Sequence, residues 1–159
     1  MALEALFHVY PDADVVVTHR DPLKVLPSCA SFAKVLRSPF TNRLDEGALR
    51  TDVNLRWEEG ARSLMRFREG SRNFQAHFHD VMYPDLMKDP MAVVREIYRQ
   101  SDREFTSGAE SAMHRFAKAN PKNKNGEHRY SLEQFGFDEE TERHRFSFYT
   151  DYYGISPEP

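Results

Sequence analysis

The sequence predicts an α/β fold in which helices flank a small parallel sheet. Two segments have the pattern of strands, residues 15–19 and residues 74–82. Most of the remaining chain repeats its apolar residues at the spacing of three or four that is typical of helices. Helical connections between two strands of one sheet place those strands parallel. The expected architecture is therefore rich in helices, with about two strands in one parallel sheet.

The first strand and the helix after it form the most informative segment. Residues 15–17 are all valine and predict a buried strand that ends at Arg20. Asp21 is the expected N-cap of the next helix, and Pro22 stands at its first position, where a missing N–H is tolerated. The sequence thus predicts that Arg20 lies at the junction between a strand and a helix.

The other elements follow from spacing, caps and helix breakers. The helix after Pro22 is expected to reach residue 37, although Pro27 should disturb its hydrogen bonding near the first turns. Gly154 is the predicted stop of the last helix. The remaining expected elements are the end of a helix at 3–8, a turn at 10–13, a connector at 38–42, and helices at 49–68, 90–100, 107–119 and from 138 to about 152, with a long polar loop at 120–131.

Length and composition set the class of protein. The chain has 159 residues, which suits one domain with a hydrophobic core, so a single domain over residues 1–159 is expected. A hydrophobic content of 40% and a charged content of 30% are typical of soluble globular proteins. The net charge of −3 argues against a dedicated nucleic-acid binder. The lone Cys29 rules out an intramolecular disulfide. No signal-peptide pattern or membrane-length apolar run occurs, which predicts a cytoplasmic protein without membrane association.

Arg20 and its neighbours predict an anion site. A guanidinium at a strand end lies here beside a helix N-terminus, and both attract anions. Ser28 follows eight residues later, about two turns into the helix, and adds a hydroxyl. The same residues would also suit a capped helix with no ligand, and that alternative stays open.

Three segments resemble the sulfotransferase family. Arg20-Asp21-Pro22 with Ser28 resembles the segment that binds the 3′-phosphate of the sulfuryl donor, 3′-phosphoadenosine-5′-phosphosulfate (PAPS). Residues 80–90 and 94–98 resemble a later strand, loop and helix of that family. Residues 124–136 and the helix after them resemble the end of bacterial sulfotransferases. The three segments occur in the family's order, and the resemblance covers most of residues 2–155.

The resemblance implies a fold and a nucleotide site. The fold would be a three-layer, P-loop-like parallel sheet with flanking helices, incomplete because the family's central N-terminal strand and phosphosulfate-binding loop have no counterpart here. PAPS would bind without a metal and leave adenosine 3′,5′-bisphosphate as product. Residues 120–131 would fold over the nucleotide, with a simple solvated loop as the alternative. The residues that the resemblance assigns to the nucleotide are Arg20, Ser28, Lys124, Asn125, Gly126 and Arg129.

The resemblance leaves the catalytic residues unassigned. The family's usual base, a histidine before the strand that carries the arginine, would fall before Met1, and His8 lies too close to the strand to take that role. The chain is therefore expected to be the C-terminal portion of a sulfotransferase-type protein. An expressed fragment, a truncated reading frame and a diverged short paralogue are all compatible with it. The uncovered sheet edge further predicts oligomerisation, a strand exchange or poor stability in isolation, and of these a homo-oligomer is expected.

Two functions of different classes follow from these expectations. In the complete protein, the sulfuryl group of PAPS would pass to a hydroxyl or amine of a small-molecule acceptor. The alternative is a non-catalytic module that binds the nucleotide or acts through oligomerisation. An unrelated P-loop-like kinase fragment is a third possibility, which the match at residues 124–136 disfavours.

The histidines and the late aromatic residues have simpler interpretations. His77 and His79 are two residues apart on the second predicted strand and could form half of a metal site. The spacing supplies no third ligand, so a structural role is favoured. His19 has no partner that the sequence identifies. The aromatic residues expected to pack in the core are Phe146, Phe148, Tyr149, Tyr152 and Tyr153.

Overall fold

The structure is a computed structural model that describes residues 2–121, 124, 126 and 130–158. In chain order its elements are α1 (Leu3–Val9), β1 (Val15–His19), α2 (Pro22–Arg37), the 3₁₀ turn η1 (Ser38–Phe40), α3 (Glu46–Gly70), η2 (Arg72–His77), β2 (Phe78–Met82), α4 (Tyr83–Lys88), α5 (Pro90–Gln100), α6 (Ser107–Ala119), η3 (Glu133–Phe135) and α7 (Glu139–Tyr153). No helix in these described parts is long and apolar enough to cross a membrane.

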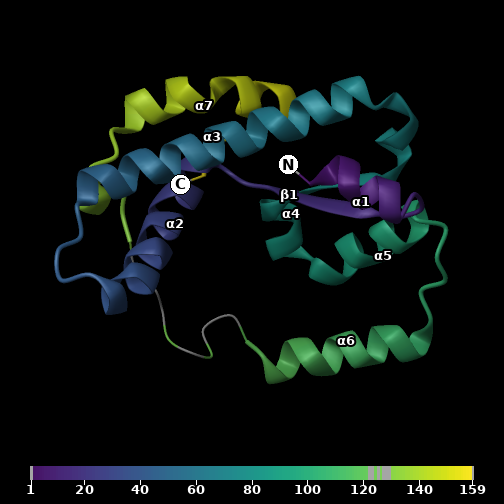
Figure 1. Cartoon of the computed structure of the whole chain (residues 1–159). Coiled ribbons are helices and arrows are strands. Elements are labelled where there is room, and N and C mark those ends of the chain that lie inside the picture. The colour runs from purple at the N-terminus through teal and green to yellow at the C-terminus, as the bar shows by residue number, and fades with distance from the viewer. Residues whose placement is uncertain (1, 122–123, 125, 127–129, 159) are drawn as a thin grey trace.

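The sheet consists of β1 and β2, which pair in parallel. Val15 lies opposite Phe78 and His19 lies opposite Met82, so the carboxyl ends of the two strands meet at one edge. Figure 1 shows α3 and α7 running together on one side of the strands, with α4 and α5 on the other side. The predicted helix-rich α/β fold with a parallel two-stranded sheet is confirmed.

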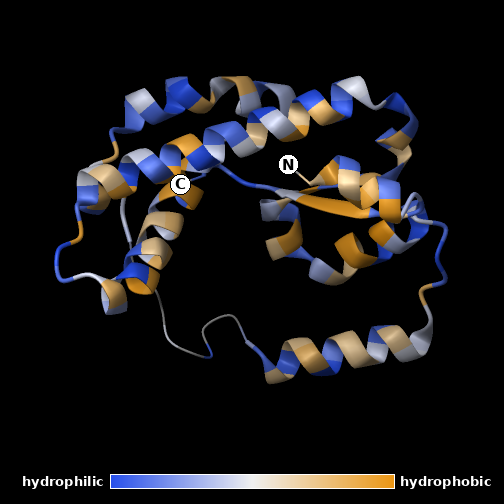
Figure 2. Cartoon of the chain, in the orientation of Figure 1, coloured by the Kyte–Doolittle hydropathy of each residue, from blue (hydrophilic) through white to orange (hydrophobic). Residues whose placement is uncertain are grey.

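Two hydrophobic clusters hold these elements together. The first joins four elements through one buried side chain from each: Leu26 of α2, Leu49 of α3, Phe135 of η3 and Phe146 of α7. The second packs α1 onto α3 and the strands, and there the ring of Phe7 stacks on Phe74 with centroids 4.3 Å apart. Figure 2 shows the hydrophobic colour concentrated along β1, which lies at the centre of the fold. The strand is only partly buried, which corrects the predicted buried strand: Val15 and Val17 are half-buried and Val16 is 46% exposed. Packing of Val15 and Val17 against the second cluster, together with pairing to β2, positions the residues that follow β1.

Capping residues and glycines in the sequence predicted most helix boundaries correctly. Asp21 caps α2 as predicted, since its side chain accepts a hydrogen bond from the Leu23 N–H at 3.0 Å. Gly154 ends α7 in a left-handed conformation with φ of +65°, also as predicted. Pro27 lies inside α2 and removes one N–H donor, but the helix continues to Arg37.

Three further sequence predictions are corrected. The long helix begins at Glu46 instead of residue 49, because Asp45 caps it by accepting from the Ala48 N–H. The second strand begins at Phe78, because the residues before it form the turn η2. Of the late aromatic residues, Phe146 is buried as expected, but Tyr152 is 51% exposed and is not a core residue.

Candidate functional site

Arg20 stands between the end of β1 and the first turn of α2. Tyr83 occupies the corresponding position after β2, and the parallel register brings both residues to the same edge of the sheet. The guanidinium carbon of Arg20 lies 4.0 Å from the centroid of the Tyr83 ring. This cation–π contact fixes one face of the guanidinium.

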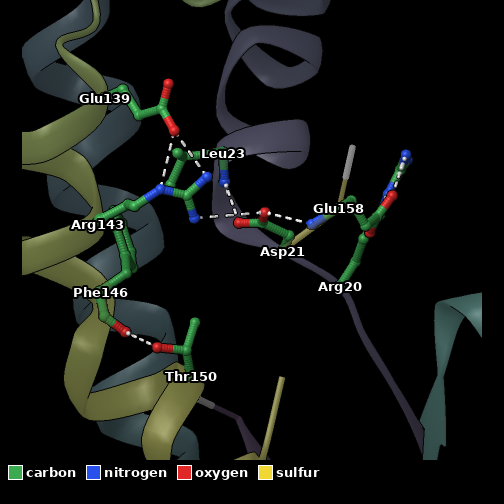
Figure 3. A network of polar contacts seen from close by, with 8 residues as sticks. All are labelled: Arg20, Asp21, Leu23, Glu139, Arg143, Phe146, Thr150 and Glu158. Atoms are coloured by element: carbon green, nitrogen blue, oxygen red, sulfur yellow. Dashed lines mark hydrogen bonds and ion pairs between the residues drawn. The ribbon is translucent and has the colours of Figure 1, made fainter. Parts of the chain in front are cut away.

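The guanidinium of Arg20 holds a carboxylate. Its Nε donates to both carboxylate oxygens of Glu158, at 3.0 and 3.1 Å, and its Nη2 donates to Oε2 at 3.0 Å. Figure 3 shows the two side chains facing each other at the junction. Burial opposes the charge on Arg20, but the hydrogen bonds and attraction from Glu158 outweigh it and raise the pKa of Arg20 above its ordinary value. Arg20 is therefore placed to bind an anion through a two-pronged contact.

Arg20 and Glu158 line a cavity of about 400 Å³ at the N-terminus of α2. Lys24 and Arg143 add two further cationic side chains to its lining. Arg143 donates to Oε1 of Glu139 from Nε at 2.9 Å and from Nη2 at 2.8 Å, so a carboxylate already satisfies part of its fork (Figure 3). The cavity is thus a mixed-charge site.

A second and more apolar cavity, of about 550 Å³, lies between β1, α3 and α7. Its lining includes Val17, Trp57 and Phe146. Arg20 also lines it, and Arg20 is the only residue shared by the two linings. This arrangement suits a ligand that combines a flat apolar group with an anionic group.

A buried polar network lies directly before Arg20 in the chain. His19 is fully buried, and its Nε2 donates to Asp80 Oδ1 at 2.8 Å while its Nδ1 lies 2.7 Å from the Tyr149 hydroxyl. Arg68 binds both oxygens of Asp80, at 2.7 and 2.9 Å. Burial raises the pKa of Asp80, but the hydrogen bonds from His19 and Arg68 outweigh it and lower the pKa to about 2. The network ties β1 to β2, α3 and α7.

Of the other predicted site residues that the structure describes, none contacts Arg20. Ser28 is half-buried in α2 and lines neither cavity. Lys124 is exposed, and its Nζ donates to Asn120 Oδ1 at 3.0 Å. Gly126 is exposed, with φ of +101°. No described contact joins either residue to Arg20, and Asn125 and Arg129 lie outside the described residues.

The histidine pair predicted as half of a possible metal site is divided between two elements. His77 belongs to η2 and His79 to β2. His79 is buried, and its ring nitrogens lie 2.9 Å from Gln100 Oε1 and 3.3 Å from Asp14 Oδ1. These contacts support the structural role that the sequence favoured. Within the described parts of the chain, no three His, Cys, Asp or Glu side chains form a candidate metal group.

Sequence reasoning missed Tyr83, Glu158 and the network around His19. Tyr83 could have been found, because residues that follow neighbouring parallel strands meet at one edge. Glu158 gave no signal, since it meets Arg20 across 138 positions. The partners of His19 are equally non-local, with Asp80 and Tyr149 lying 61 and 130 positions away.

Comparisons with known proteins point to one family. A sequence profile described as "Sulfotransferase family" matches residues 1–107, which include the β1–α2 junction. The crystal structure of sulfotransferase STF9 from Mycobacterium avium is 28% identical, with a TM-score of 0.83 over 97% of this chain and 39% of that chain. Sulfotransferase STF1 from Mycobacterium tuberculosis H37Rv is 31% identical, with a TM-score of 0.72 over 92% of this chain and 36% of that chain. The chain thus spans less than two-fifths of either relative. No curated protein sequence matches it.

Proposed function

Since this chain belongs to the sulfotransferase family, we propose that its β1–α2 junction binds the 3′-phosphate of PAPS. The complete protein would transfer the sulfuryl group to a hydroxyl or amine of a small-molecule acceptor. The observation that carries this proposal is the two-pronged contact of Arg20 with a carboxylate. The Glu158 carboxylate supports the fit, because a phosphate presents the same pair of acceptor oxygens to a guanidinium.

The surroundings of Arg20 favour an anion with an attached ring. The Arg20 side chain is only 30% exposed, so a charge-assisted hydrogen bond there is partly protected from water. Lys24 lies in the same cavity and adds positive charge. The apolar cavity on the other side of Arg20 offers Trp57 and Val17 to a flat group. A nucleotide combines an anionic phosphate with a flat base and so matches both parts of this site.

In sulfuryl transfer the protein mainly orients the reacting groups and stabilises the charge that develops on them. The 3′-phosphate is remote from the reacting sulfur, so Arg20 would supply binding energy that holds the donor in place. Ser28, Lys124, Asn125, Gly126 and Arg129 are kept in this proposal by resemblance alone. PAPS, the acceptor class, the cytoplasmic location and the single domain over residues 1–159 stay predictions.

Calorimetric titration with adenosine 3′,5′-bisphosphate tests the proposal, with 5′-AMP as the ligand that lacks the 3′-phosphate. We expect the chain to prefer the bisphosphate. Arg20→Ala should weaken its binding by about 1.5–3 kcal/mol, the range for hydrogen bonds to a charged group. Arg66→Ala is the matched control, because Arg66 is an exposed arginine of α3 that lines neither cavity. Equal affinity for the two nucleotides, or an unchanged affinity in Arg20→Ala, would contradict the assignment.

The alternative of a self-associating module is favoured by one specific observation. Phe32, Val35 and Leu36 recur at helical spacing on α2, and each side chain is more than half exposed, at 65%, 64% and 54%. Phe40, in the turn that follows, is 89% exposed. We name these four side chains the α2 patch. We propose that this patch packs against the same patch of a second copy of the chain, which is compatible with nucleotide binding at the other end of α2.

A further inference from the structure

We propose that residues 155–158, here called the strap, compete with the nucleotide for Arg20. The Glu158 carboxylate occupies Nε and Nη2 of the guanidinium, so the strap must leave when a phosphate binds through the same two donors. This inference rests on the proposed function of Arg20 as a phosphate ligand. It means that a segment of the same chain lowers the affinity of Arg20 for the nucleotide.

For a phosphate that binds through the Nε–Nη2 edge, the geometry of the contact makes the two states exclusive. Both Nε and Nη2 of Arg20 donate to Glu158, so one edge of the guanidinium fork is filled. The Tyr83 ring covers a face of the same guanidinium at 4.0 Å. An incoming phosphate that uses the Nε–Nη2 edge therefore has to displace the carboxylate.

The strap is held at the junction by a short series of contacts. Gly154 reverses the chain after α7, and the Ile155 N–H donates to the Thr150 carbonyl at 2.9 Å. The Glu158 N–H then donates to Asp21 Oδ2 at 3.0 Å, next to the oxygen that caps α2 (Figure 3). Pro157 restricts the backbone of the strap, which lowers the entropy lost when it docks. These contacts hold Glu158 in place, but they are few enough that binding of an anion to Arg20 can displace the strap.

The charges of the cavity assign the role to Glu158 in particular. Among the other acidic residues that line the cavity, Glu139 is paired with Arg143 and Asp21 caps α2. The remaining one, Glu133, is exposed and is hydrogen-bonded to Ser131. Glu158 is the carboxylate in contact with Arg20, and its side chain is 17% exposed. Closure by the strap therefore neutralises the guanidinium on which phosphate binding depends. The strap is closed when Glu158 is bound to Arg20. The apparent affinity for a phosphate is then the affinity of the open chain multiplied by the fraction of molecules in which the strap is open.

Binding of adenosine 3′,5′-bisphosphate to strap variants tests the inference. We expect Glu158→Gln, and a chain that ends at Gly154, to bind it about three- to tenfold more tightly than the unchanged chain. Glu140→Gln is the matched control, since Glu140 is an exposed carboxylate in the first turn of α7 that lines neither cavity. This control should shift the affinity less than twofold. Circular dichroism should show the helix content of each variant unchanged.

Hydrogen exchange on the unchanged chain supplies a second readout. Saturation with adenosine 3′,5′-bisphosphate should speed exchange in the peptide that contains the Glu158 amide, because the bond to Asp21 breaks when the strap leaves. Unchanged affinity in both strap variants, an equal gain in Glu140→Gln, or slower exchange of the strap would overturn the inference while the proposed function stands. Failure of every variant to bind the bisphosphate would overturn the proposed function, and the inference with it.

Discussion

Arg20 is positioned by the two residues that flank it. His19 is buried and bound to Asp80, which fixes the end of β1. Asp21 is also buried, and its carboxylate holds the first turn of α2. The backbone of Arg20 is therefore restrained on both sides, while its side chain remains partly accessible. A preorganised guanidinium loses less entropy when it binds an anion than a freely rotating one.

Asp80 is the residue on which the network around His19 depends, since it accepts from both His19 and Arg68. Asp80→Asn removes the charge and leaves the largely buried Arg68 without its ion-pair partner. We expect a loss of about 2–3 kcal/mol in the free energy of unfolding, measured by urea denaturation. Asp52→Asn is the control, because Asp52 pairs with two arginines at the surface and should lose clearly less. Equal losses in both variants would contradict a special role for the network.

The same carboxylate predicts a dependence of stability on pH. The pKa of Asp80 is lowered to about 2 in the fold, whereas the pKa of an aspartate in an unfolded chain is about 3.9. Its stabilising contribution is therefore complete above about pH 4 and is lost as the pH falls toward about 2. The stability difference between the unchanged chain and Asp80→Asn should shrink across that range. A difference that stayed constant down to about pH 2 would show that the charge of Asp80 does not stabilise the fold.

Among the elements, two helix glycines should respond in opposite directions to the same substitution. Gly154 ends α7 with φ of +65°, so an alanine there would be strained even though no atom lies within 4 Å of the added Cβ. Gly60 lies inside α3, again with nothing within 4 Å of an added Cβ. We expect Gly154→Ala to lower the free energy of unfolding by about 1 kcal/mol and Gly60→Ala to raise it by about 0.5–1 kcal/mol. Urea denaturation measures both, and a stabilising Gly154→Ala would contradict the strained turn.

Elements set by neighbouring residues could be predicted from the sequence, while those set by distant contacts could not. Asp21 and Gly154 act on their own helices, and both were placed correctly. The residues before Phe78 have strand-like composition, but they form a 3₁₀ turn instead, in which Phe74 packs against Phe7 of α1. The position of Arg20 followed from local pattern, and that of Tyr83 could have been inferred from the parallel strands that precede both residues. Glu158, in contrast, reaches Arg20 only through the tertiary fold.

In the molecule as a whole, β1 and α2 both expose apolar side chains to solvent. The described strands form a sheet of order β1–β2, and Val16 of β1 is 46% exposed. The α2 patch adds four large apolar side chains that contact water. Clusters of exposed apolar side chains such as the α2 patch are typical of association sites. A second copy can cover it symmetrically, because a two-fold axis brings each patch onto its own counterpart.

Self-association through the α2 patch predicts a reversible and concentration-dependent dimer. Sedimentation velocity should show the average mass rising with concentration, at an ionic strength high enough to screen surface charge. Phe32→Ser combined with Leu36→Ser should leave the chain monomeric, because it removes two of the four apolar side chains of the patch while preserving α2.

Phe116→Ser is the matched control for that measurement, because Phe116 is 71% exposed on α6 and lies outside the α2 patch. It should dimerise like the unchanged chain. If the unchanged chain stayed monomeric at every concentration, or if Phe116→Ser dissociated the dimer as fully as the double variant, the α2 patch would not be the interface. The exposed edge near Val16 would then be the next surface to test, by Val16→Lys, since a charge on an edge strand opposes pairing between sheets.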